Sequence, residues 1–145
     1  MYYASLDDNR VIVQCNIANN GRMRFISAIY DTGARYTCFR ASTLNSMLKE
    51  ESCQGSETKM LGGFIGSGFS KFYKYEVEKF AFGTIDLGKQ DVWITFDEAV
   101  TSNVVGYDII KQVNRLSFAG EGKEYFFGDR SELLEYAEGF IKNYE

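Results

Sequence analysis

A single aspartate stands where a carboxylate can take part in chemistry. Residues 25–30 form a mostly apolar, β-like run that leads directly into Asp31, Thr32 and Gly33. Gly33 permits a tight turn because it lacks a side chain, and the Thr32 hydroxyl can donate a hydrogen bond. The pattern therefore predicts a buried strand that delivers a carboxylate to a turn. Taken alone, Asp31 fits a turn or helix-capping role at least as well as a catalytic one.

The chain contains no histidine, and this absence removes several catalytic classes. Ser-His-Asp and Cys-His nucleophiles, histidine-ligated zinc and imidazole acid–base steps all need that side chain. The three cysteines, Cys15, Cys38 and Cys53, are an odd number without metal-ligand spacing. We therefore expect free thiols, no metal site and no cofactor. An enzyme of this composition has to move protons with carboxylates, lysine or tyrosine.

The bulk composition is that of one folded domain. The 145 residues are 45% hydrophobic and 16% aromatic, which is enough to build a hydrophobic core. Lysine and arginine number 16 against 20 acidic residues, without a basic cluster, so we expect no nucleic-acid partner. No apolar run approaches the ~20 residues of a membrane span, and the first residues lack a signal-peptide pattern. With reduced thiols, these features predict a cytoplasmic protein.

Alternation of apolar and polar residues predicts a mostly β protein. Residues 11–18 alternate, and Asn-Asn-Gly at 19–21 is a hairpin signal before a second strand at 23–30. Within residues 72–82 the alternation changes phase near Glu78, which predicts a bulge or bend. The other predicted strands are residues 36–39, 92–96 and 104–105, with a hairpin over 116–127.

Helical spacing of apolar residues predicts three helices. The first covers residues 41–50, and a second, short helix follows Asp108, which we expect to be its cap. The last covers residues 130–144, where Asp129 and Glu132 have the spacing of a capping box.

A glycine-rich segment at residues 60–69 combines four glycines with large apolar side chains. Solvated linkers lack such side chains, so the composition favours a mobile hairpin tip of the kind that covers a site. The segment has no phosphate-loop spacing. An ordinary glycine-rich hairpin is the alternative interpretation.

The order of three segments along the chain indicates more than each segment does alone. They are Asp-Thr-Gly-Ala within residues 28–34, followed by Thr37, then the glycine hairpin at 60–69, and then residues 104–110. In this order they resemble the catalytic loop, the flap and the hydrophobic-hydrophobic-Gly segment of the retropepsin-like aspartic proteases. This is the single-lobe class that includes the retroviral proteases, and the resemblance covers residues 10–118.

The resemblance implies a fold and a domain organisation. The expected fold is mostly β, a single-lobe closed barrel with a flap hairpin and a short helix after the hydrophobic-hydrophobic-Gly segment. Residues 1–145 then form one domain, in which 119–145 add a hairpin segment and a C-terminal helix.

The resemblance also implies the residues of the site. Asp31, Thr32 and Gly33 are the expected catalytic loop, and the chain has only one such triplet. The family pattern then requires a homodimer in which each subunit contributes Asp31. The expected substrate-binding residues are Ala34, Arg35, Leu61, Gly62, Gly63, Phe64 and Ile65. The expected supports of the catalytic loop are Val104, Val105, Gly106 and Asp108.

The chemistry implied by the resemblance is peptide hydrolysis by two aspartates. Two adjacent carboxylates cannot both ionise easily, so they share one proton. The ionised carboxylate activates a water molecule, and the protonated one polarises the carbonyl of the bond to be cut. The peptide or protein substrate would bind as an extended strand under the flap, with large apolar side chains beside that bond.

Two positions depart from the family pattern. Retroviral members commonly carry an acidic residue and an arginine where this chain has Arg35 and Tyr107. Arg35 is therefore expected to pair with Asp108 or with an acidic group on the substrate. The chain also extends beyond the family core, so we expect residues 116–127 to supply the dimer interface.

Other functions stay open at this stage. A peptide-binding or dimerisation module with the same fold could lack turnover. A carboxylate-based glycosidase is less well supported, because no second candidate acid occupies a comparable turn. The cysteines are expected to be buried spectators, with regulation by oxidation of Cys38 as an alternative.

Overall fold

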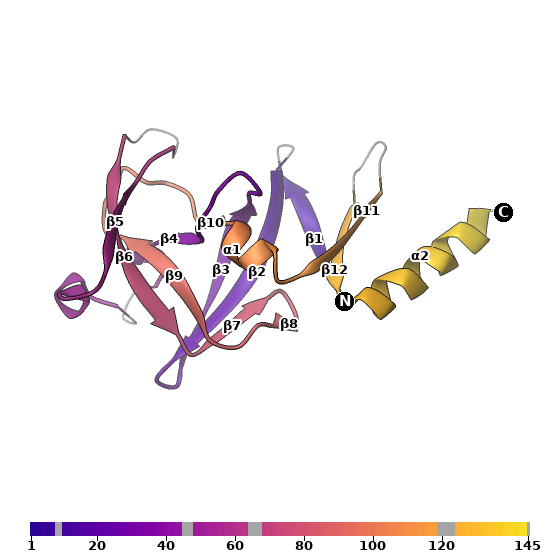
Figure 1. Cartoon of the computed structure of the whole chain (residues 1–145), viewed down its shortest axis with the longest axis horizontal. Helices are drawn as coiled ribbons and strands as arrows, with labels where there is room; N and C mark the ends of the chain where they lie inside the picture. The colour runs from indigo at the N-terminus through magenta and orange to yellow at the C-terminus, as the bar shows by residue number, and fades with distance from the viewer. Residues whose placement is uncertain (8–9, 45–47, 64–67, 119–123, 145) are drawn as a thin grey trace.

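One mixed β-sheet makes up most of the protein (Figure 1). The computed structural model describes residues 1–7, 10–44, 48–63, 68–118 and 124–144. The strands are β1 (Tyr2–Asp7), β2 (Arg10–Asn19), β3 (Arg22–Tyr30), β4 (Cys38–Arg40), β5 (Thr58–Leu61), β6 (Ser70–Val77), β7 (Lys79–Phe82), β8 (Ile85–Asp86), β9 (Gln90–Thr95), β10 (Val104–Val105), β11 (Asn114–Phe118) and β12 (Glu124–Gly128). The helices are the 3-10 turns η1 (Ala41–Thr43) and η3 (Glu50–Cys53), and the α-helices α1 (Tyr107–Ile110) and α2 (Arg130–Tyr144).

The strand order is β11-β12-β1-β2-β3-β10-β4-β9-β6-β5, and β7 branches from β2 to pair with β8. Within the described residues the end strands β11 and β5 do not pair with each other. The mostly β fold class is confirmed, but the sheet is open where we expected a closed barrel. In Figure 1 the β5–β6 hairpin lies at one end, the β11–β12 hairpin and α2 at the other, and β3 and β10 between them.

The predicted hairpin at 19–21 is confirmed. Strands β2 and β3 pair antiparallel, with Ile12 opposite Ile29. Asn20 and Gly21 both have positive φ, at 51° and 74°, as a tight two-residue hairpin turn requires. The hairpin therefore fixes the register in which β3 delivers its last residue to the loop at Asp31.

The predicted change of phase near Glu78 is confirmed as a break between two strands. β6 pairs with β9, whereas β7 pairs with β2. The Asn19 side chain holds the corner, since its Oδ1 accepts a hydrogen bond from Glu78 N at 2.7 Å and its Nδ2 donates to Glu76 O at 2.9 Å. The bend lets one continuous chain join two parts of the sheet.

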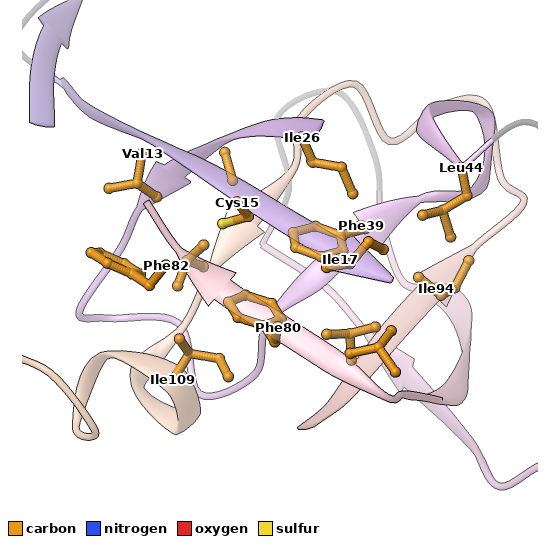
Figure 2. Packing of buried hydrophobic residues seen from close by; sticks show 14 of the residues in the cluster. Val13, Cys15, Ile17, Ile26, Phe39, Leu44, Phe80, Phe82, Ile94 and Ile109 are labelled. Atoms are coloured by element: carbon orange, nitrogen blue, oxygen red, sulfur yellow. The ribbon is translucent and has the colours of Figure 1, made fainter. Parts of the chain in front are cut away.

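The hydrophobic core lies between the bent parts of this sheet (Figure 2). The inward-facing residues Val13, Cys15 and Ile17 of β2 are fully buried, as their alternation predicts. Phe39 and Phe80 meet at the centre, with ring centroids 6.4 Å apart and planes 7° from parallel. The core thus connects the short strand after the Asp31 loop to the branch strand β7.

The helix predictions have mixed outcomes. The helix predicted over 41–50 is not found in its described part, where η1 ends at Thr43 and residues 48–49 are not helical; 45–47 lie outside the described residues. Helix α1 follows Val105 as predicted, but its N-cap is Gly106 rather than Asp108.

The capping box of α2 is confirmed, because Glu132 N donates to Asp129 Oδ1 at 2.9 Å and Asp129 N donates to Glu132 Oε1 at 3.2 Å. Glu132 Oε2 also accepts a hydrogen bond from the N-terminal amine at 2.9 Å. In the part of the chain that the structure describes, no helix is long and apolar enough to span a bilayer.

The central aromatic pair provides a test of the packing. Phe80→Ala should lower the free energy of unfolding by about 3–5 kcal/mol, because it leaves a cavity that the surrounding rings fill only partly. Phe25→Ala is the matched control, since Phe25 is 75% exposed whereas Phe80 is fully buried. Urea unfolding should show a change within about 0.5 kcal/mol for the control. Equal losses in the two variants would contradict this packing.

Candidate active site

The Asp31 loop begins where β3 ends, and backbone hydrogen bonds hold both of its sides. Asp31 N donates to Val105 O at 3.0 Å, and Ala34 N donates to Asp31 O at 3.2 Å. The Asp31 carboxylate accepts a hydrogen bond from Gly33 N at 2.9 Å. Asp31, Thr32 and Gly33 are all exposed. The loop therefore presents a fixed carboxylate to the outside of this chain.

Strand β10 lies in the sheet between the strands on either side of this loop. Val104 and Val105 pair in parallel with Ile29 and Tyr30 of β3, and Val104 also pairs with Cys38 of β4. Both valines are buried, and their role as supports of the loop stays a prediction. The chain thus leaves the sheet at Asp31 and returns at β4 across a strand from much later in the sequence.

A partly buried hydrogen-bond network links the second half of the loop to α1. Thr37 is fully buried, and its Oγ1 donates to Asp108 Oδ1 at 2.7 Å and accepts from Gly106 N at 3.0 Å. Asp108 Oδ2 accepts from Thr37 N at 3.1 Å. We call these three residues the Thr37 lock. The sequence pattern indicated all three residues. It predicted that Asp108 caps the helix, however, and not that its carboxylate accepts hydrogen bonds from Thr37.

Gly106 is required by a close approach of two backbone segments. A Cβ atom on Gly106 would lie 2.5 Å from both C and O of Tyr36 and 2.9 Å from Ala34 O. Contacts this short would force backbone to move. Tyr107 N donates to Ala34 O at 2.7 Å in the same region, so the segment after β10 lies directly against the loop.

Arg35 does not pair with Asp108, one of the two partners expected for it. Both Asp108 oxygens bond Thr37, and the ion pairs of the described residues do not include Arg35. The Arg35 guanidinium lies 5.6 Å from the centre of the Tyr36 ring. Arg35 and Tyr107 are both exposed, so the other expectation, an acidic group on a substrate, stays a prediction.

The glycine-rich hairpin has an anchored base. Strands β5 and β6 pair with Leu61 opposite Ser70, and the Ser70 hydroxyl donates to Asp97 Oδ2 at 2.7 Å. Leu61 packs against a small buried cluster that includes Trp93, with Tyr36 beside it. The base of the hairpin therefore contacts the residue that follows Arg35.

The tip of this hairpin is only partly described. Gly62 and Gly63 are exposed, and Gly63 has a φ of 90° that favours glycine. Phe64 and Ile65, which we expected to contact substrate, lie outside the described residues. Their role stays a prediction.

A hollow beside Asp31 was not foreseen from the sequence. It has a volume of ≈ 410 Å³, and its lining includes Arg10, Ile29, Tyr30, Asp31, Arg115 and Tyr125. Arg115 and Tyr125 belong to the β11–β12 hairpin, which is more than 80 residues from Asp31 in the sequence. Only tertiary structure brings them to the Asp31 loop, so no local pattern could have identified them.

The three cysteines are buried, and none of them forms a disulfide. Burial raises the pKa of Cys15 to about 12. It also raises the pKa of Cys38 to about 12, with a further upward contribution from the negative charge of Asp108. The thiolate is the reactive form, so these values favour the spectator role over regulation by oxidation of Cys38.

The described residues contain no group of three or more histidine, cysteine, aspartate or glutamate side chains placed to hold a metal ion. The chemical groups at this site are therefore the Asp31 carboxylate, the loop amides and the arginines of the hollow. What this arrangement offers is a carboxylate for proton transfer and cations for an anionic ligand.

Comparisons with known proteins bear on the fold alone. No protein-family model matches the chain, and no curated protein matches it. The fold is similar to that of the retropepsin-like, single-lobe aspartic proteases. The crystal structure of a retropepsin-like aspartic protease from Rickettsia conorii superposes with a TM-score of 0.61 over 86% of this chain and 95% of that one. Because the two sequences are 10% identical, the likeness establishes the fold.

The Thr37 lock can be tested by an isosteric substitution. Thr37→Val removes the hydroxyl and leaves Gly106 N and one Asp108 oxygen without this partner, which should cost about 1–3 kcal/mol of stability. Thr58→Val is the control, because Thr58 is exposed on β5. Chemical unfolding measures both. A Thr37 variant as stable as the control would show that the lock does not hold the loop.

The thiols provide a test of burial at the site. In the folded protein at pH 8, a chromogenic disulfide reagent should react slowly with all three cysteines, because each is buried and burial raises the pKa of each thiol, to about 12 for Cys15 and Cys38. After unfolding in guanidinium chloride all three should react at once. Fast reaction of Cys38 in the native protein would contradict its buried position.

Proposed function

We propose that this protein is an aspartic endopeptidase that works as a homodimer. The observation that carries the proposal is the exposed Asp31 carboxylate on a rigid turn, held by Val105 and the Thr37 lock. The fold it shares with a retropepsin-like protease supports the proposal. The chain would cut peptide bonds in extended segments of peptides or proteins.

The need for a second copy follows from the chemistry. Hydrolysis of an amide without a metal or histidine needs an acid and a base together. Among the described residues, Asp31 is the only carboxylate that lines this hollow. A second chain, related by a two-fold axis, would bring another Asp31 to the same place.

In the proposed dimer the two Asp31 carboxylates share one proton. The ionised carboxylate takes a proton from water as the oxygen attacks the carbonyl carbon, and the protonated carboxylate stabilises the developing negative charge on the carbonyl oxygen. Collapse of the tetrahedral intermediate breaks the C–N bond, and the leaving amine receives a proton. The pair titrates as a unit, so neither subunit owns the proton.

Substrate binding would use the loop and the glycine-rich hairpin together. Backbone groups near Gly33, Ala34 and Arg35 are exposed or half-buried beside the carboxylate. The β5–β6 hairpin, with Leu61, Gly62 and Gly63 at its described end, would cover a peptide bound as an added strand. Phe64 and Ile65 would add apolar contacts beside the cut bond.

The dimer interface is proposed at the C-terminal hairpin, as the sequence led us to expect. Strand β12 lies between β1 and β11, so its backbone is already paired on both sides. Strand β11 is an end of the sheet, and its outer edge is free to pair with another strand. Within the segment 116–127, we therefore propose that the outer edge of β11 is the part that pairs with the second chain.

A peptide-binding module without turnover is the second candidate. The same loop, hollow and hairpin could hold a peptide if the two carboxylates did not meet. Arg35 favours this candidate slightly, because it places an exposed cation next to the catalytic triplet.

Replacement of Asp31 tests the chemistry directly. Asp31→Asn should reduce peptide cleavage by on the order of 10²–10⁴-fold between pH 3 and 7, the size of a general acid–base contribution. Asp86→Asn is a matched control, since exposed Asp86 accepts a hydrogen bond from Gly88 N just as Asp31 does from Gly33 N. Activity that survives Asp31→Asn would end the proposal.

Sedimentation tests the assembly. We expect a monomer–dimer equilibrium that shifts to dimer with concentration, and cleavage that rises with the dimer fraction. A strict monomer at high concentration could not assemble two Asp31 side chains. Such a result, with cleavage still present, would require a mechanism within one chain.

A further inference from the structure

We propose that the hollow beside Asp31 selects an acidic side chain of the substrate, and that Arg115 and Arg10 provide the positive charge for it. We call this hollow the Arg115 pocket. The inference rests on the proposed function, because it assigns a substrate preference to the same site. The carboxylate of a glutamate or aspartate near the cut bond would be the group that it binds.

The position of the pocket supports a role in substrate selection. Asp31, Ile29, Arg115 and Tyr125 line the same hollow of ≈ 410 Å³. A peptide bound at the Asp31 carboxylate would therefore lie beside the two residues of the C-terminal hairpin. A side chain one or two positions from the cut bond is within reach of them.

Arg115 is held by its neighbours, and no carboxylate of the described residues pairs with it. Its Nη1 donates to the Tyr30 hydroxyl at 3.4 Å, and its guanidinium lies 5.7 Å from the centre of the Tyr125 ring. Tyr30 is itself packed against Phe127, with ring centroids 5.4 Å apart. A guanidinium stacked and oriented in this way keeps donors available for a planar carboxylate.

The charge in the pocket favours an anion. Two arginines against one aspartate leave an excess of one positive charge among the lining residues, although the whole chain has a net charge of −4. Neither Arg10 nor Arg115 is in an ion pair with another described residue. An incoming carboxylate would therefore meet two guanidinium groups that no described residue of this chain neutralises in an ion pair.

The apolar part of the lining fits the rest of such a side chain. Val11 and Ile29 lie in the pocket with the two arginines. The methylene groups of a glutamate can contact these side chains while its carboxylate reaches a guanidinium. The expected preference is therefore glutamate on this side of Asp31, together with large apolar residues on the side of the β5–β6 hairpin.

The test is cleavage of a synthetic decapeptide library in which glutamate, glutamine or lysine is fixed at one position at a time, read by mass spectrometry. At one position near the cut bond, glutamate should be preferred to glutamine about tenfold, the size of one charge-assisted pair. Arg115→Gln should bring this ratio close to one, and Arg115→Glu should reverse it in favour of lysine. Lys142→Gln, an equal loss of charge at the exposed far end of α2, should keep the ratio.

Two results would overturn the inference while leaving the proposed protease intact. One is cleavage without a glutamate preference at any position, and the other is a preference that survives in both Arg115→Gln and Arg10→Gln. If no peptide is cut, the proposed function fails, and retention of the same library on the immobilised protein still tests the pocket. Enrichment of acidic peptides that Arg115→Gln removes would support it, and unselective retention would refute it.

Discussion

The structure depends on a partly buried contact between residues 71 positions apart, Thr37 and Asp108. The half-buried Asp108 carboxylate needs hydrogen-bond donors, because removing a charge from water without them is costly. Thr37 supplies both its amide and its hydroxyl, and the hydroxyl also accepts from Gly106 N. The contact works only because Gly106 has no side chain where Tyr36 passes. Strand β10 is thereby kept between β3 and β4, and the Asp31 loop is hydrogen-bonded to the segment that follows it.

These hydrogen bonds explain how an exposed carboxylate can be held in a defined position. A loop residue in solvent is ordinarily mobile, but Asp31 has its backbone bonded to Val105 and its carboxylate to Gly33 N. Catalytic groups must be held close to their productive geometry by the residues around them. The proposed dimer needs this rigidity twice, because two separately folded loops have to place their carboxylates against each other.

Local sequence patterns predicted turns, bends and caps correctly, but they did not predict contacts between residues that are far apart in the sequence. The hairpin before β3, the break at Glu78 and the capping box of α2 follow from spacing and turn chemistry, and all three are confirmed. The helix predicted over 41–50 was wrong in its described part, because Ala41, Leu44 and Leu48, which have helical spacing, are also buried when only a 3-10 turn forms at 41–43. Arg115 reaches the Asp31 loop only through the pairing of β12 with β1, which no local pattern contains.

The central claim is that one site is built by two chains. Isothermal titration with a peptide that carries a statine residue, a mimic of the tetrahedral intermediate, measures this directly. We expect one ligand to bind for every two chains, with binding lost in Asp31→Asn and retained in Asp86→Asn. One ligand bound by each monomeric chain, or binding that does not depend on Asp31, would contradict it.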